Sequence, residues 1–168
     1  MLQLSSSQPE VELHHVERLS LGDLVRSVVA EFHREASTRG IDLGASVAAN
    51  TWVNGDAVQL RVLLNNLVRN ALRYAPAGSL VDVVAAVDGG RPVLRVIDNG
   101  PGIPLADRDS VFERFRRGSG SHVRRGDPSG SGLGLAIVQA IAGRHGAIVS
   151  LHSPVDQSTG LEVRIAFT

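Results

Sequence analysis

Hydrophobic residues recur at three- and four-residue steps between Gln59 and Tyr74, which predicts a helix with one buried face. The apolar positions are Leu60, Leu63, Leu64, Leu67 and Ala71. A second stripe on the same helix carries Asn66, Asn70, Arg73 and Tyr74, again three or four residues apart. Asn is a poor helix former, so this stripe has two interpretations. It is either a solvated face, or one wall of a nucleotide site that offers an amide oxygen to a hard cation and an arginine to phosphate.

The remaining pattern alternates helices and strands without repeated βαβ units, with two strands joined by a hairpin signal at 88–91. It predicts a two-layer α/β sandwich, in which three main helices cover one face of a mixed, mostly antiparallel sheet. Residues 1–12 read as a tail and residues 13–168 as one domain. The other predicted helices are Ser20–Arg39 and Leu133–His145, and the predicted strands are Ile41–Val47, a short edge strand at Trp52–Val53, Leu80–Val87, Val93–Asp98, Ala147–His152 and Leu161–Phe167.

Composition narrows the chemistry. The chain has 168 residues, no cysteine and a formal net charge of zero, so thiol chemistry is excluded and neither a nucleic-acid nor a membrane surface is indicated. All 17 basic residues are arginine. Because a P-loop and a protein-kinase fold each require a lysine, both of those nucleotide-binding folds are excluded. No apolar run approaches the length of a membrane span.

Two glycine-rich loops are candidate ligand contacts. In the first, 98–104, Asp98 precedes Gly100, Gly102 and Ile103; its carboxylate could accept a hydrogen bond from the amine of a base, or the loop could be a plain turn. The second loop opens a predicted helix, where bare N–H groups could bind an anion, although a merely flexible loop is the alternative. It comprises Gly130, Ser131, Gly132, Leu133, Gly134 and Leu135.

The segment between these loops contains Phe112 and Phe115, followed by Arg116 and Arg117 and a Gly/Ser-rich stretch. We expect this stretch to be mobile without ligand. The two arginines could meet phosphate oxygens when it closes, or simply be solvated.

In their order and spacing, these pieces resemble the catalytic ATP-binding domain of bacterial sensor histidine kinases, within the Bergerat-fold (GHKL) ATPases. Residues 66–74 resemble the N box of that family, 98–102 its first glycine box, 112–115 its F box and 130–135 its second glycine box. The resemblance extends over about residues 20–167. The third glycine box is weak, because Gly160 is present but Leu161 stands where threonine is usual.

The resemblance implies a role for each matching residue. Asn70 would hold Mg²⁺ against the ATP phosphates, Asp98 would bind the adenine amino group, and Tyr74 would line the adenine pocket. Arg73 and Arg117 would face phosphate, although Arg116 stands where the family often has tyrosine. The remaining contacts to ATP would come from Gly100, Gly102, Ile103, Gly130, Ser131, Gly132, Leu133, Gly134 and Leu135.

Asn66 occupies the position at which hydrolysing relatives carry a glutamate base, and an amide cannot take a proton from water. The resemblance therefore implies a domain that binds ATP and Mg²⁺ and holds the γ-phosphoryl for a histidine, with Asn66 and Arg117 in the catalytic region. That histidine would lie on a separate dimerisation domain, since none of the six histidines here has the family's surroundings. We expect a monomeric fragment, the cytoplasmic part of a membrane-anchored sensor with a response-regulator partner.

Three alternatives stay open at this point. The first is a serine kinase of the anti-sigma-factor type, which shares the Bergerat fold. The second is an interaction module that binds nucleotide without transferring phosphate. The third is a hydrolysing ATPase, which the amide at Asn66 disfavours.

Overall fold

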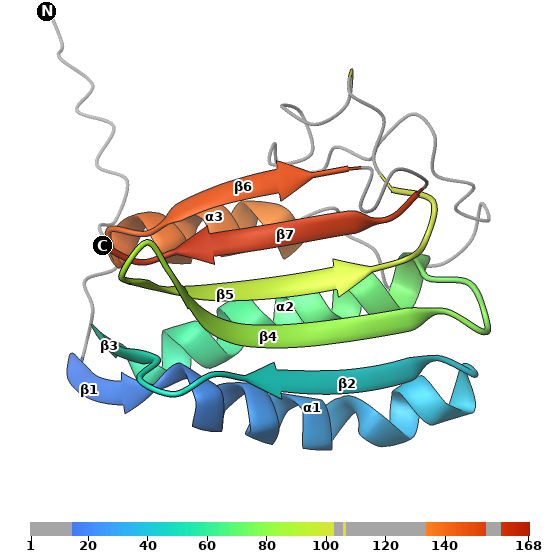
Figure 1. Cartoon of the computed structure of the whole chain (residues 1–168), viewed down its shortest axis with the longest axis horizontal. Helices are drawn as coiled ribbons and strands as arrows, with labels where there is room; N and C mark the ends of the chain where they lie inside the picture. The colour runs from blue at the N-terminus through green and yellow to red at the C-terminus, as the bar shows by residue number, and fades with distance from the viewer. Residues whose placement is uncertain (1–14, 103–105, 107–133, 154–158) are drawn as a thin grey trace, which may run out of the picture.

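The computed structural model describes residues 15–102, 106, 134–153 and 159–168. Within these residues, three helices lie on one face of a five-stranded sheet, and two short strands pair separately (Figure 1). This arrangement confirms the predicted two-layer sandwich. The elements are β1 (Glu17–Ser20), α1 (Leu21–Thr38), β2 (Asp42–Val47), β3 (Trp52–Gly55), α2 (Ala57–Tyr74), β4 (Leu80–Asp88), β5 (Arg91–Asp98), α3 (Gly134–Arg144), β6 (Ile148–His152) and β7 (Leu161–Ala166).

The five strands follow the order β2-β4-β5-β7-β6. β2 runs parallel to β4, and every other pair in this sheet is antiparallel. The β4–β5 hairpin turns through Gly89 and Gly90, whose φ angles of +56° and +78° suit a tight turn between right-twisted strands. The sheet is therefore mixed and mostly antiparallel, as predicted.

The apolar stripe of α2 forms the centre of the core. Asp56 begins this helix as its N-cap, because its side-chain Oδ1 accepts from the N–H groups of Val58 at 3.0 Å and Gln59 at 3.1 Å. Helix α1 is capped in the same manner by Ser20 and packs beside β2. The buried residues of α2 are Leu60, Leu63, Leu64, Leu67, Val68, Ala71 and Leu72, which include all five predicted positions.

The main difference from the predicted elements lies before α1. β1 was not predicted. It has only four residues, and their side chains do not alternate between buried and exposed, so the sequence lacks the two-residue hydrophobic pattern of a strand. The strand predicted at Trp52–Val53 extends to Gly55, but it pairs with β1 and forms no edge of the main sheet. Arg18 of β1 lies over the Trp52 ring, 5.1 Å from its centroid, and this contact adds to the pairing.

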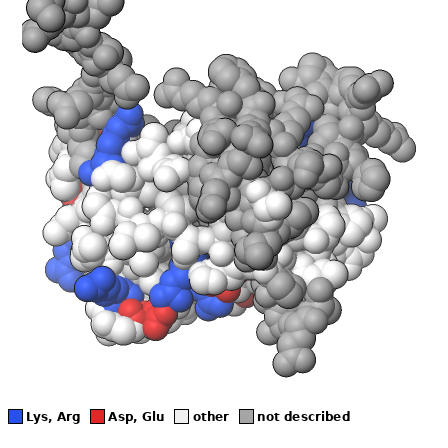
Figure 2. Space-filling model, turned by 90° about the horizontal axis from the view of Figure 1, so that it is seen from above, with Lys and Arg blue, Asp and Glu red and all other residues white. Residues whose placement is uncertain are grey.

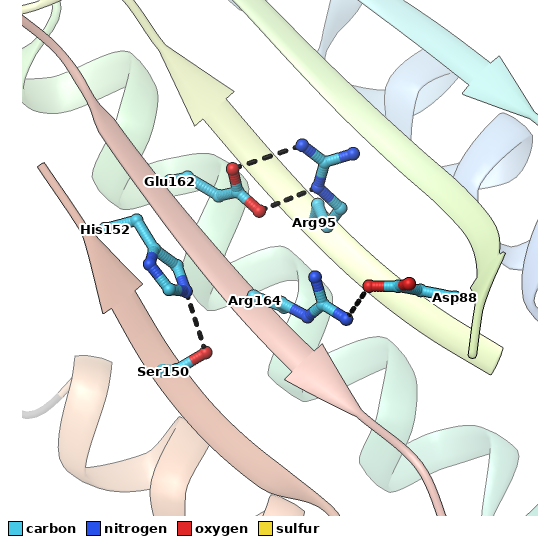
Figure 3. A network of polar contacts seen from close by, with 6 residues as sticks. All are labelled: Asp88, Arg95, Ser150, His152, Glu162 and Arg164. Atoms are coloured by element: carbon cyan, nitrogen blue, oxygen red, sulfur yellow. Dashed lines mark hydrogen bonds and ion pairs between the residues drawn. The ribbon is translucent and has the colours of Figure 1, made fainter. Parts of the chain in front are cut away.

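The sheet face opposite the helices carries a network of charged side chains (Figure 3). Arg95 donates to Glu162 through two hydrogen bonds of 2.7 and 3.1 Å, and Arg164 pairs with Asp88. Seen from above the view of Figure 1, basic and acidic side chains lie next to one another along the lower edge of the described surface (Figure 2). The pairing agrees with a net charge of zero and with a solvated outer face. Among the described helices, none is long and apolar enough to cross a bilayer.

We predict that Glu162→Gln lowers the free energy of unfolding at pH 7 by about 1 kcal/mol, because the charged half of a two-bond pair is lost. The hydrogen bonds from Arg95 lower the pKa of Glu162 despite its partial burial. The stabilisation by this carboxylate is therefore present above the pKa of the unfolded state and is lost as the pH falls through the lower folded value.

Urea unfolding of both proteins between pH 7 and pH 3 measures this difference. The matched control is Glu31→Gln, which breaks the more exposed pair with Arg61 and should change stability by under about 0.5 kcal/mol. Equal losses in the two variants, or a Glu162 effect that does not decrease as the pH falls from 7 to 3, would contradict the prediction.

Candidate functional site

Helices α2 and α3 lie antiparallel, and the predicted site residues meet where α2 ends and α3 begins. Gln59 near the start of α2 contacts Arg144 at the end of α3, with 3.5 Å between Oε1 and Nη1. At the other end, a Cβ added to Gly134 would lie 3.1 Å from Nδ2 and 3.2 Å from Oδ1 of Asn70. The Asn70 carboxamide therefore contacts the first residue of α3, and only a residue without a side chain fits there unless the amide moves.

Asn66 lies one helical turn before Asn70 on α2. Its side-chain Nδ2 donates to the backbone carbonyl of Val62 at 2.7 Å. This bond to the preceding turn holds the carboxamide along its own helix and leaves the side-chain oxygen as an acceptor. The position thus offers an amide, and no carboxylate, beside Asn70.

Asp98 is the last residue of β5 and lies on the helix-covered face of the sheet, because it alternates with the buried Leu94 and Val96. Its Oδ1 accepts from the Gly100 N–H at 2.9 Å. Burial raises the pKa of Asp98, while hydrogen bonds from the backbone of Gly100 and Leu161 act in the opposite direction. A ligand that donates a further hydrogen bond would stabilise the charged form of this carboxylate.

The first glycine loop packs against the end of α2. A Cβ added to Gly100 would lie 3.6 Å from the Cα of Ala75 and 3.7 Å from the carbonyl oxygen of Tyr74. Asn99 fixes the loop to β4, since its side-chain oxygen accepts from the Leu80 N–H at 2.8 Å. Asp98 and its loop therefore lie within about one helical turn of Asn70 along α2.

On its other side the loop contacts the start of β7. Gly102 has a φ of +74°, and a Cβ there would lie 2.7 Å from the carbonyl oxygen of Gly160 and would also clash with Oγ of Ser153. Gly160 has a φ of +104°, and a Cβ there would clash with the carbonyl oxygen of Asp98. The Ser153 hydroxyl donates to the Gly160 carbonyl at 2.6 Å. Both glycines are thus required by close backbone packing around Asp98.

Arg73 and Tyr74 lie at the end of α2, as predicted, and contact each other. The guanidinium of Arg73 is half-buried, 5.6 Å from the centroid of the exposed Tyr74 ring. Leu135, one residue into α3, packs against the hydrophobic core and so anchors the start of that helix. A contact between Leu135 and nucleotide stays a prediction.

The structure brings together part of the predicted site. Asn66, Asn70, Arg73, Tyr74, Asp98, Gly100, Gly102, Gly134 and Leu135 are described and gather around the end of α2 and the start of α3. Ile103, Arg117 and Gly130, Ser131, Gly132 and Leu133 lie outside the described residues, as do Phe112, Phe115 and Arg116. Among the described residues no three His, Asp or Glu side chains group into a metal site.

Sequence reasoning undervalued two residues of this site. Gly160 was noted only as part of a weak motif, and Ser153 was not considered. An isolated glycine just before a strand is a usable signal for close backbone approach, whereas nothing in the sequence around Ser153 marks a contact made across the sheet end.

The fold and the site define a class of protein: a two-layer α/β sandwich whose candidate site lies between an Asn-bearing helix, a glycine loop and the start of a second helix. Comparison with known proteins agrees. Residues 55–168 match the model of the histidine kinase-, DNA gyrase B- and HSP90-like ATPases. The chain belongs to this ATPase family, and the resemblance to the ATP-binding domain of sensor histidine kinases is confirmed.

Two curated relatives are sensor kinases. The chain is 33% identical over 165 residues to the sensor protein kinase PmrB of Pseudomonas aeruginosa, covering 98% of this chain and 33% of PmrB. It is 33% identical over 153 residues to the sensor-like histidine kinase SenX3 of Mycobacterium tuberculosis, covering 91% of this chain and 37% of SenX3. The chain thus spans about a third of the length of these relatives.

Solved structures agree with the family assignment. The mycobacterial sensor histidine kinase MprB superposes with a TM-score of 0.78 at 32% identity, over 90% of this chain and 97% of that one. Full-length ShkA, solved in complex with AMPPNP, superposes with a TM-score of 0.77 at 29% identity, over 94% of this chain and 31% of ShkA.

We predict that Gly134→Ala weakens Mg²⁺-dependent binding of an ATP analogue by roughly three- to tenfold, because its methyl group displaces the Asn70 carboxamide by a few tenths of an ångström. Calorimetric titration measures the affinity.

The matched control for this variant is Gly143→Ala on the same helix, where an added Cβ meets no atom within 4 Å. It should leave affinity unchanged and stabilise α3 by about 0.5–1 kcal/mol through helix propensity. Equal affinities in the two variants would show that the contact with Asn70 does not shape the site.

Proposed function

We propose that this domain binds ATP with Mg²⁺ between the end of α2 and the start of α3, and supplies the γ-phosphoryl group to a histidine on a separate dimerisation domain. The observation that carries the proposal is the contact between the Asn70 carboxamide and Gly134, with Asp98 and its glycine loop at the same end of α2.

Asp98 and its loop fit an adenine base. The carboxylate is held by backbone N–H groups yet keeps unused acceptor capacity, and its burial makes a further donor favourable. An exocyclic amine is such a donor. Gly100 and Gly102 leave backbone without side chains beside it, where a flat ring can approach. The AMPPNP complex of ShkA supports nucleotide binding in a protein of similar structure.

Asn70 fits the role of a Mg²⁺ ligand. Mg²⁺ prefers oxygen ligands, keeps several waters and is commonly held by few protein groups together with phosphates. When bound, it would neutralise phosphate charge during transfer. The side-chain oxygen of Asn70 at the mouth of α3 would provide the protein ligand, and Arg73 a cation for phosphate.

Asn66 determines which reaction the site favours. Hydrolysis needs a group that takes a proton from water, and the amide at this position cannot do so. A neutral imidazole needs no such activation, so positioning and charge stabilisation suffice for transfer to histidine. The domain should therefore retain ATP until an acceptor histidine is presented.

The partners follow from the relatives, two of which are named as sensor kinases. We infer that this domain acts with a histidine-bearing dimerisation domain and, through it, with a response regulator, on the cytoplasmic side of a membrane-anchored sensor. Arg117, outside the described residues, would contribute a further phosphate contact.

We predict that Asp98→Ala weakens binding of a fluorescent ATP analogue at least roughly tenfold both with Mg²⁺ and with EDTA, because a buried hydrogen bond to the base is lost. Asn70→Ala should instead remove most of the Mg²⁺ dependence and leave the metal-free affinity near that of the wild type. His33→Ala, an exposed change on α1, serves as the control. Unchanged affinity in both site variants would overturn the assignment.

A second prediction concerns the acceptor. Mixed with Mg²⁺-ATP and a histidine-bearing dimerisation domain from a sensor kinase, this domain should transfer labelled phosphate to histidine, while releasing little free phosphate when alone. Acid-labile, base-stable labelling of the added domain measures the transfer. Labelling of a serine would favour an anti-sigma-factor-type kinase, rapid phosphate release alone a hydrolysing ATPase, and neither reaction a binding module.

A further inference from the structure

His145 lies directly after α3 and bridges that helix to the start of α2. Its Nδ1 is 2.8 Å from the backbone carbonyl oxygen of Ile141, and its Nε2 is 3.0 Å from the backbone nitrogen of Asp56. Asp56 is the N-cap of α2 and is itself buried. The imidazole therefore joins the C-terminal end of α3 to the N-terminal end of α2, which we call the His145 bridge.

The two partners of the ring dictate its protonation. A carbonyl oxygen can only accept, so Nδ1 must carry the hydrogen, and a backbone N–H can only donate, so Nε2 must be bare. Both bonds exist together in one neutral tautomer alone. A Cβ added to Gly55 would lie 2.8 Å from Cδ2 of His145, so the ring also requires a glycine at this position.

The bridge lies at the opposite end of the α2–α3 pair from the candidate nucleotide site. Between Gly134 and His145 the helix spans about 16 Å at 1.5 Å per residue. Because a helix is stiff along its axis, fixing the His145 end sets where Gly134 meets Asn70. The 3.5 Å contact between Arg144 and Gln59 is exposed and weaker, which leaves the His145 bridge as the principal polar restraint among those described at this end.

We propose that His145 is a positioning residue for the nucleotide site, and that its neutral form holds α3 in the register that places Gly134 against Asn70. This inference rests on the proposed function. Protonation of the ring would place a hydrogen on Nε2 facing the Asp56 N–H, two donors in opposition, and would release the bridge. Loss of the bridge would therefore lower nucleotide affinity.

Three charged residues lie near the imidazole ring of His145. Asp56 contributes its carboxylate from α2, with Oδ1 engaged by two backbone N–H groups; Arg144 precedes the ring on its own chain; and Glu17 of β1 pairs with Gly55 across the small sheet. The Asp56 carboxylate could attract a charged imidazole, but only by abandoning the bond from the Asp56 N–H to Nε2. The charged ring thus favours a different arrangement of the helix ends.

The experiment compares His145→Ala and His145→Gln with the wild type. The Gln side-chain oxygen can accept from the Asp56 N–H but does not titrate. His33→Gln, on the exposed surface of α1, is the matched control. Calorimetry gives the affinity for a non-hydrolysable ATP analogue with Mg²⁺ at pH 8. Circular dichroism and urea unfolding report whether each variant is folded.

At pH 8 we expect His145→Ala to bind roughly tenfold more weakly than the wild type and His145→Gln to bind within about threefold of it. The control His33→Gln should bind as tightly as the wild type.

Wild-type affinity in a folded His145→Ala, or a folded His145→Gln that binds as weakly as His145→Ala, would overturn the proposal. A nitrogen-15 NMR spectrum of the imidazole gives a readout that needs no nucleotide: a hydrogen on Nε2 at pH 8 would also overturn it. Failure of the wild type to bind Mg²⁺-ATP would instead refute the proposed function. That result differs from every outcome that bears on His145 alone.

Discussion

The burial of one face of α2 determines where the candidate site forms. Seven residues of this helix are buried among the sheet and its neighbouring helices, and the burial of each large side chain contributes on the order of 2 kcal/mol. Such a stripe fixes the rotation of the helix about its axis. With that rotation set, the neighbouring stripe with Asn66 and Asn70 can only face α3. The amides of the site are therefore placed by the core.

The position of Asp98 costs folding free energy, because its carboxylate is buried. The two-residue alternation of β5 places its carboxylate on the face with Leu94 and Val96, where burial disfavours the charge. The backbone N–H groups of Gly100 and Leu161 recover part of this cost. Leu161 follows Gly160, where an added Cβ would clash with the carbonyl oxygen of Asp98. A buried acid with unused acceptor capacity is what a ligand donor would complete.

Features set by residues close together in the sequence could be predicted, whereas features set by contacts between distant residues could not. The apolar stripe of α2 and the Gly89–Gly90 turn are local patterns, and both were predicted correctly from the sequence. β1 was missed because its strand exists through pairing with β3, more than thirty residues away. The packing of Gly160 against Asp98 depends in the same way on the alignment of β5 with β7. Motif spacing identified the residues of the candidate site, whereas the long-range contacts that position them are seen only in the folded structure.

The ends of α2 and α3 are joined by residues that lie far apart in the sequence. These residues are Gly55, Asp56, His145 and Gly146. Gly146, with a φ of +63°, ends α3 immediately after the histidine, and Gly55 leaves room for the ring. The N–H of an N-cap residue has no partner within its own helix, and burial of Asp56 denies it water. A bare imidazole nitrogen satisfies that donor, where an apolar side chain would leave it unpaired at a cost of about 1–3 kcal/mol. The N-terminus of α2 thus requires a hydrogen-bond acceptor at position 145. That acceptor in turn sets the position of Gly134 at the other end of α3.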